Sequence, residues 1–139
     1  MNPICIEKNI QATPEQVWKA ITEKEIMKQW YFDIPDFELK VHTTFNFYEG
    51  EAKKYHHRGV MKEIIPYKKL KHTWTHPSHS QGNSMLTWEL YPDAQYTKLV
   101  LTHDGIENFA DAGTAFSREN YEVGWNEFLQ TLKAFLEKQ

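Results

Sequence analysis

The sequence predicts an α+β fold in which a curved antiparallel sheet encloses one long C-terminal helix. Two observations carry this prediction: apolar and polar residues alternate through most of residues 37–103, and an amphipathic segment follows at residues 117–137. Alternation with a period of two is typical of half-buried strands, whereas an apolar stripe with a period near 3.6 is typical of a packed helix. Because one helix stripe and one sheet face can bury each other, the economical arrangement has the sheet gripping the helix.

Two short helices are expected directly after the first strand. Thr13 is a favoured N-cap residue, Pro14 suits the first helical position, and Gln16 completes a capping box. A second capping-box pattern at residues 22–25 is expected to begin another short helix. The apolar residues that follow these two starts would form the buried faces, and they are Val17, Trp18, Ala20, Ile21, Ile26, Met27 and Trp30.

Seven strands are predicted in total, and all of them are expected to belong to one sheet. The first strand precedes the short helices. The other six are separated by short turns, several of which contain proline, and this is the pattern of an antiparallel meander. The predicted strands are residues 3–11, 37–41, 45–49, 57–65, 70–76, 86–90 and 97–103.

The final helix is expected to begin after Ser117, which is a favoured N-cap residue, and to end near Glu137. Its length of roughly 30 Å would cross the whole sheet. A single helix is too narrow to fill a seven-stranded groove, so we expect a cavity that the short helices and the loop at residues 105–116 would close. Gly124 lies inside this helix, where a close approach of the sheet or of a ligand would explain a glycine.

The composition excludes several classes of function. The 139 residues are expected to form one domain, over residues 1–139. The chain has 16 basic and 19 acidic residues, whereas a nucleic-acid partner requires a basic face. No apolar run is long enough for a membrane span and no signal peptide is recognisable, so a cytoplasmic location is expected. The single cysteine, Cys5, rules out an internal disulfide framework.

Four motifs in the same order resemble one branch of the SRPBCC (START / birch-pollen-allergen-like) superfamily, the branch named after the activator of heat-shock protein 90 ATPase. They lie in Thr13–Trp30, Gly59–Trp74, Leu99–Gly105 and Gly124–Leu136. The resemblance covers nearly the whole chain and implies a helix-grip fold with a hydrophobic cavity between sheet and helix. It implies less about function, because the superfamily includes lipid and steroid carriers, polyketide cyclases and chaperone regulators.

Aromatic side chains supply most of the candidate ligand-binding residues. If the strand faces that carry them look inward, they converge with the helix stripe on one space and form a pocket wall for a flat or apolar ligand. The alternative is that they only fill the core, as most buried aromatic residues do. The aromatic candidates on the strands and the long helix are Phe45, Phe47, Trp74, Trp88, Trp125 and Phe128. Trp30 follows the second short helix, where it would lie at the mouth of the pocket or only pack that helix down.

Two polar residues, His103 and Glu63, are candidate anchors that would orient the ligand. His103 ends a strand whose alternating residues are expected to point inward, and it could bind a ligand, act as a general base, or serve only as a structural histidine. Glu63 is an anchor or a paired carboxylate if it points inward, because a lone buried charge is too costly. If it points outward, it is a solvated strand residue.

No metal site, cofactor or catalytic residue is predicted. The histidines lack ligand spacing, since His72 and His76 share a strand face but would lie about 13 Å apart. The sequence contains no Gly-x-Ser-x-Gly motif and no phosphate-binding glycine-rich loop. These patterns do not favour metal-dependent or nucleophilic catalysis.

We expect the protein to bind a hydrophobic or aromatic small molecule between the sheet and the C-terminal helix, without catalysing a reaction. Two alternatives stay open. The resemblance implies regulation of a chaperone or another protein partner, for which an exposed apolar patch on the outer sheet face would be the distinguishing feature. It also implies a cyclase-like enzyme, which would need His103 and Glu63 in one pocket as acid and base.

Overall fold

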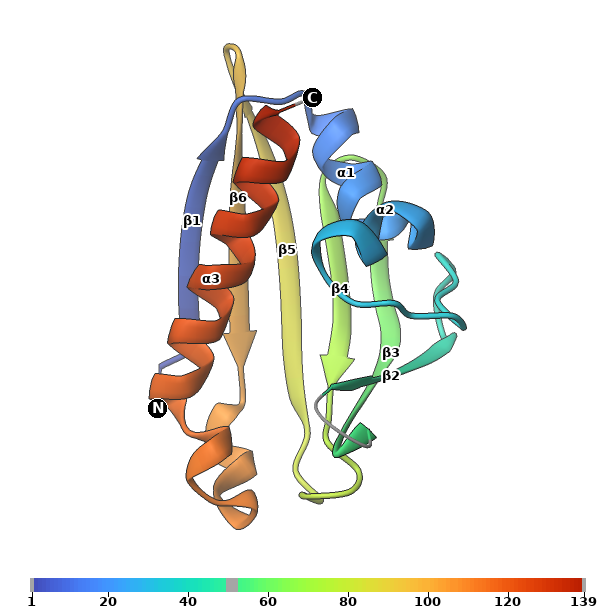
Figure 1. Cartoon of the computed structure of the whole chain (residues 1–139), viewed down its shortest axis with the longest axis vertical. Coiled ribbons are helices and arrows are strands. Elements are labelled where there is room, and N and C mark those ends of the chain that lie inside the picture. Colours follow the sequence, from blue (N-terminus) through green and yellow to red (C-terminus); the bar gives the residue numbers. More distant parts are fainter. Residues whose placement is uncertain (1, 50–52, 139) are drawn as a thin grey trace.

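The computed structural model describes residues 2–49 and 53–138, which form an antiparallel sheet with helices packed on one face (Figure 1). The predicted α+β class and the long C-terminal helix are confirmed. In chain order the elements are β1 (Ile4–Ile10), α1 (Pro14–Thr22), α2 (Lys24–Trp30), β2 (Thr44–Glu49), β3 (Tyr55–Ile65), β4 (Lys69–Trp74), β5 (Ser84–Asp93), β6 (Tyr96–Asp104), the 3-10 helices η2 (Ile106–Ala112) and η3 (Thr114–Phe116), and α3 (Arg118–Glu137).

The sheet has six strands in the order β1-β6-β5-β4-β3-β2, and each neighbouring pair is antiparallel. The prediction of seven strands is therefore wrong, because residues 37–41 form an irregular segment of bends that leads into a turn instead of a strand. The alternation of apolar residues there does not mark one face of a sheet, since Phe37 is buried but Leu39 is 42% exposed. The hydroxyl of Thr43 donates to the carbonyl of Lys40 at 2.7 Å and stabilises a turn.

The two short helices begin in different ways. At the start of α1, the Thr13 side chain accepts a hydrogen bond from the amide of Gln16, and the Gln16 side chain accepts one from the amide of Thr13. The second predicted capping box is wrong, because the N-cap of α2 is Glu23 and its side chain makes no capping hydrogen bond. The hydroxyl of Thr22 donates to the carbonyl of Trp18 at 2.6 Å and is not available as a cap.

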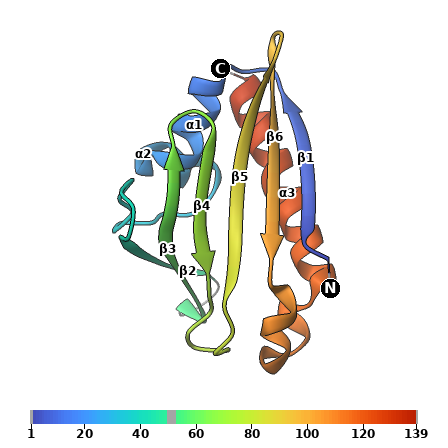
Figure 2. The same cartoon turned by 180° about the vertical axis from the view of Figure 1, so that it is seen from behind.

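Helix α3 lies over the strands β1 and β6, and α1 and α2 cover the other half of the same sheet face (Figures 1 and 2). Ser117 caps α3 as predicted, by accepting a hydrogen bond from the amide of Asn120. Hydrogen bonds between side chains and main-chain groups fasten both halves of α3 to β1 and its flanking residues. They join Arg118 to the carbonyls of Asn2 and Pro3, Lys133 to the carbonyl of Asn9, and Glu137 to the amide of Gln11.

The hydrophobic core fills the space between the sheet and these helices. Leu99 and Leu101 of β6 and Leu129 and Leu132 of α3 are completely buried there. The segment between β6 and α3, predicted as a loop, forms the two 3-10 helices and buries Phe109 and Phe116. In the described part of the chain, every helix is too short or too polar to cross a membrane.

Candidate functional site

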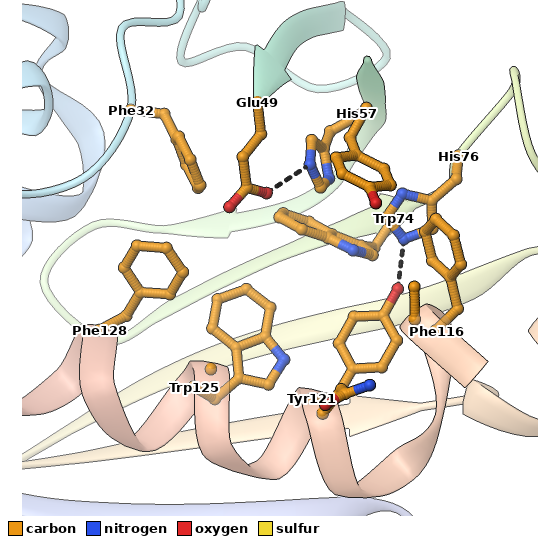
Figure 3. A pocket seen from close by; sticks show the side chains of 13 residues that line it. Phe32, Glu49, His57, Trp74, His76, Phe116, Tyr121, Trp125 and Phe128 are labelled. Carbon is orange, nitrogen blue, oxygen red and sulfur yellow. Dashed lines mark hydrogen bonds and ion pairs between the residues drawn. The ribbon is translucent and has the colours of Figure 1, made fainter. Parts of the chain in front are cut away.

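A cavity of about 360 Å³ lies between the sheet and the first half of α3 (Figure 3). Its volume is within the range of about 300–1,000 Å³ that is usual for small-molecule pockets. Aromatic side chains form most of its wall. The side chains of His57, His76 and Tyr121 and the indole N–H of Trp74 lie toward one end, called here the polar end, and Phe32 and Phe128 lie toward the other (Figure 3). The lining residues are Phe32, Glu49, Tyr55, His57, Trp74, His76, Ala115, Phe116, Asn120, Tyr121, Gly124, Trp125 and Phe128.

Helix α3 supplies one wall of the cavity. Tyr121, Gly124, Trp125 and Phe128 are spaced three and four residues apart, so they share one face of the helix. Apart from its chain neighbours and the backbone of its own helix, a methyl group placed on Gly124 would meet no atom within 4 Å. The glycine therefore lies beside open space, and neither the sheet nor another helix approaches it closely.

On the sheet side, Glu49 and His57 form a hydrogen-bonded pair at the cavity wall (Figure 3). The distance between Nε2 of His57 and Oε1 of Glu49 is 3.0 Å. Because a carboxylate can only accept, Nε2 carries the proton and donates it. The imidazole also stacks on Phe47, with ring centroids 4.6 Å apart and an angle of 6° between the planes. Its second nitrogen, Nδ1, is buried and has no hydrogen-bond partner.

His76 and Tyr121 form a second polar pair, which links the turn after β4 to α3. Nε2 of His76 and the hydroxyl of Tyr121 are hydrogen-bonded. Burial lowers the pKa of His76 to about 3 and raises the pKa of Tyr121, so both groups are uncharged near neutral pH. The phenol can then donate to Nε2, which places the imidazole proton on Nδ1. That nitrogen is also buried without a partner.

The indole N–H groups of the two tryptophans in the cavity wall have different surroundings. Trp125 donates to Nδ1 of His103 at 3.0 Å. The N–H of Trp74 is buried and points toward the Tyr121 hydroxyl, but no hydrogen bond of normal geometry joins them (Figure 3). A buried donor without a partner costs about 1–3 kcal/mol. Trp74 therefore contributes an unused hydrogen-bond donor to the polar end of the cavity.

The aromatic candidates from the sequence divide into three groups in the structure. Those that line the cavity are Trp74, Trp125 and Phe128. Phe45, Phe47 and Trp88 do not line the cavity; they fill the core and border a separate void of only about 20 Å³, which Trp74 also borders. Trp30 lines neither space; it is buried, and its indole donates to the carbonyl of Ala20 at 2.8 Å, which fixes α2 against α1.

The two polar candidates do not meet in the cavity. His103 is completely buried, and its Nε2 lies 2.8 Å from the hydroxyl of Ser84 while Nδ1 accepts the Trp125 N–H. It thereby positions a tryptophan of the cavity wall. Glu63 is paired with Lys69 at 3.0 Å, and its side chain is 43% exposed. The acid–base arrangement that the cyclase hypothesis requires is therefore not formed by these two residues.

Several lining residues were not among the candidates, although the sequence contained signals for them. Glu49 follows Phe45 and Phe47 in the same alternation, and this alternation brings its side chain to the inner face of β2. His76 continues the alternation of Trp74 in the same way. Tyr121 lies one helical turn before Trp125. Spacing from a neighbouring aromatic residue is therefore the signal that could have identified all three.

The site offers no ligand set for a metal ion. Across residues 2–49 and 53–138, no three His, Cys, Asp or Glu side chains are placed to hold one. A larger hollow of about 640 Å³ over β2 and β3 is lined mainly by polar and charged residues such as Asp36 and Arg58. Its wall is more polar than that of the aromatic cavity, whereas ligand pockets are lined predominantly by apolar side chains. The aromatic cavity can enclose a flat apolar molecule and orient a polar atom of that molecule at its polar end.

An antiparallel sheet that grips a C-terminal helix, with a cavity between them, defines the helix-grip class of the SRPBCC superfamily. Within this class the chain belongs to the AHSA1 family, described as activator of Hsp90 ATPase homolog 1-like protein, whose model matches residues 11–137. The resemblance expected from the sequence motifs is thus confirmed. No curated protein has significant sequence similarity to the chain.

Solved structures support the fold assignment. Protein CV1439 from Chromobacterium violaceum has a TM-score of 0.81 at 20% identity, covering 98% of this chain and 97% of that one. PFC0360w, an Hsp90 activator from Plasmodium falciparum, has a TM-score of 0.79 at 22% identity, covering 99% and 97%. The Aha1 dimer from Colwellia psychrerythraea gives 0.74 at 23% identity, covering 99% and 97%. At these identities the similarity establishes the shared fold alone.

Proposed function

We propose that the protein binds a hydrophobic or aromatic small molecule in the cavity between the sheet and α3. The observation that supports this most strongly is the cavity itself, which is lined mainly by aromatic side chains and which the half-buried Gly124 borders with open space. Protein interiors are normally close-packed, and large internal spaces are few. A cavity of about 360 Å³ that opens to solvent between the sheet and a helix is therefore a feature that a ligand would explain.

The character of the wall indicates the kind of ligand. Trp74 and Trp125 have ring centroids 5.1 Å apart, and Trp125 and Phe128 are 5.9 Å apart. Aromatic rings at such distances present flat, polarisable surfaces on which another ring packs edge-on or offset. Burial of the ligand's apolar surface, at about 25 cal/mol per Å², would supply most of the binding free energy.

The test compares the native protein with two variants at Gly124, by native mass spectrometry and by titration with the uncharged fluorescent probe N-phenyl-1-naphthylamine. Gly124→Leu places a branched side chain in the open space, and Gly124→Ala is the matched control that adds only a methyl group. We expect the native protein and Gly124→Ala to bind the probe or carry a co-purified molecule, and Gly124→Leu to lose both. Equal binding by all three proteins, or binding by none, would contradict the proposal.

Regulation of a chaperone is a second candidate, favoured by the family match and by the structural similarity to a Plasmodium falciparum Hsp90 activator. The described residues do not gather exposed large apolar side chains on the central outer face of the sheet. Those that are exposed lie in loops, on the edge strand β2, near hairpin ends and on α3, and they are Leu39, Val41, Tyr48, Ile65, Tyr67, Tyr91, Tyr96 and Val123. Stimulation of a purified Hsp90 ATPase by the protein, measured against Gly124→Leu, would show whether such activity exists and whether it depends on the cavity.

A further inference from the structure

We propose that the cavity selects uncharged aromatic compounds that carry a hydroxyl group, and rejects aromatic carboxylates of the same shape. This inference rests on the proposed ligand-binding function and adds the chemical class of the ligand. Two independent features of the lining carry it: the distribution of charge around the cavity and the unused hydrogen-bonding atoms at its polar end.

The charge distribution is unfavourable for an anion. Among the residues 2–49 and 53–138 that line the cavity there is no lysine or arginine, and the only carboxylate is that of Glu49. His76 is uncharged near neutral pH because burial lowers its pKa to about 3. A positive charge on His57 would be paired with Glu49, whose oxygen lies 3.0 Å away. A ligand carboxylate would therefore lose its hydration without gaining a free cation in return.

One lysine, Lys54, lies near the rim of the cavity. Nζ of Lys54 is 5.2 Å from the centroid of the Tyr55 ring, which lines the cavity. Lys54 is exposed and is not itself part of the lining. An ammonium group in solvent attracts an anion only weakly, because water and salt screen the interaction. It does not offset the carboxylate of Glu49, which is in the wall.

The unused polar atoms favour a hydroxyl group. Trp74 offers an N–H, and Nδ1 of His57 offers a lone pair when the ring is neutral or an N–H when it is charged; both atoms are buried without partners. A hydroxyl group can accept from the indole and can pair with His57 in either state. A carboxylate can only accept, so it cannot use a neutral His57. The ring centroids of His57 and Trp74 are 5.0 Å apart and both side chains line the cavity, so one small group can contact both rings.

The experiment uses three probes of similar shape: naphthalene, 2-naphthol and 2-naphthoate, titrated calorimetrically into the native protein at about pH 7.5, where the naphthoate is ionised and the naphthol is not. We expect 2-naphthol to bind more tightly than naphthalene, and at least about tenfold more tightly than 2-naphthoate, which is about 1.4 kcal/mol. The N–H resonance of Trp74, assigned with Trp74→Phe, should shift on addition of 2-naphthol.

Two variants separate the local charge of Glu49 from the net charge of the protein. Glu49→Gln keeps a side-chain oxygen that can accept from His57 but removes the charge, and we expect it to narrow the preference for 2-naphthol over 2-naphthoate. Glu127→Gln removes the same charge from an exposed position of α3 outside the lining, and should leave the preference unchanged.

Each remaining outcome counts against a specific claim. Equal affinity for 2-naphthol and 2-naphthoate, or tighter binding of the carboxylate, would overturn this inference while leaving the proposed function intact. Equal affinity for naphthalene and 2-naphthol would overturn the hydroxyl preference. Binding of none of the three probes would overturn the proposed function together with this inference.

Discussion

Replacement of Gly124 by alanine should stabilise the ligand-free protein, even though the residue lies at the candidate site. Alanine is more favourable than glycine inside a helix by about 0.8–1.0 kcal/mol. In most buried helices this gain is offset by the contacts that the new methyl group must make. Here the methyl group would meet no atom within 4 Å, and Gly124 is not among the glycines with positive φ. The full gain in helix propensity should therefore appear in the free energy of unfolding.

The expected change in melting temperature follows from the size of the chain. Unfolding entropy is about 2.1 cal/mol/K per residue, so the 139 residues give roughly 0.29 kcal/mol/K. A gain of about 1 kcal/mol divided by this entropy raises the Tm by about 3 °C. The shift is large enough to measure by differential scanning calorimetry.

The measurement should use protein that has been unfolded and refolded to remove bound molecules, because a ligand also raises the Tm by mass action. Urea titration at one temperature would give the same free-energy difference by an independent route. An unchanged or lower stability of Gly124→Ala would refute the reasoning, because it would mean that the space beside Gly124 is already filled. The proposed ligand site would then lose its main support.

Three other perturbations have definite expected results. Gly59→Ala should destabilise the protein by about 1–3 kcal/mol in urea unfolding, because its Cβ would lie 2.4 Å from the buried ring of Phe45; a neutral effect would contradict this packing. Trp125→Phe should cost about 1–3 kcal/mol more than Trp74→Phe, because only the Trp125 indole has a partner to lose; equal losses would show that the two N–H groups are equivalent. The stability should also fall with acid, because burial holds the pKa values of three histidines below the value of about 6.5 in the unfolded chain, at about 4 for His72 and about 3 for His76 and His103. Between pH 6.5 and these lower pKa values, the unfolded state binds more protons than the folded state. The free energy of unfolding should therefore have its full value above pH 6.5 and decrease below it, by up to about 4 kcal/mol per pH unit. Urea titrations that give the same free energy of unfolding at about pH 7 and at about pH 5 would contradict this.

The elements that the sequence predicted well are those with strong local determinants. The capping box at Thr13–Gln16 and the cap at Ser117 involve residues three positions apart, and both are present in the structure. The long apolar stripe of α3 was equally informative. The strand prediction for residues 37–41 was wrong because alternation over so few residues also occurs in turns. No local pattern distinguishes a short strand from a turn in this segment. Register and hydrogen bonding to a neighbouring strand decide between them, and these are tertiary properties.

The candidate site was predictable only in part for a related reason. Trp125 and Phe128 could be assigned to the inner face of the helix from spacing alone. The division of the other aromatic residues between the cavity and the core depends on how the helix lies across the sheet. Phe47 and Trp74 are on neighbouring parts of one sheet face, with rings 5.6 Å apart, yet only Trp74 lines the cavity. No pattern within a strand encodes this difference.

The hydrogen bonds that attach α3 to β1 and its flanking residues fix one margin of the helix, the margin that faces β1. Arg118, Lys133 and Glu137 bind main-chain groups at or beside β1, so that margin is held at both ends of the helix. The cavity lies at the opposite margin, toward β2, β3 and β4, where aromatic contacts and the bond between His76 and Tyr121 hold the helix. The margin of α3 that borders the cavity is thus fixed by fewer direct hydrogen bonds to the main chain than the margin beside β1. Loss of the bond between His76 and Tyr121 would loosen only the side of the helix that faces the cavity, while the hydrogen bonds to β1 and its flanking residues stay in place.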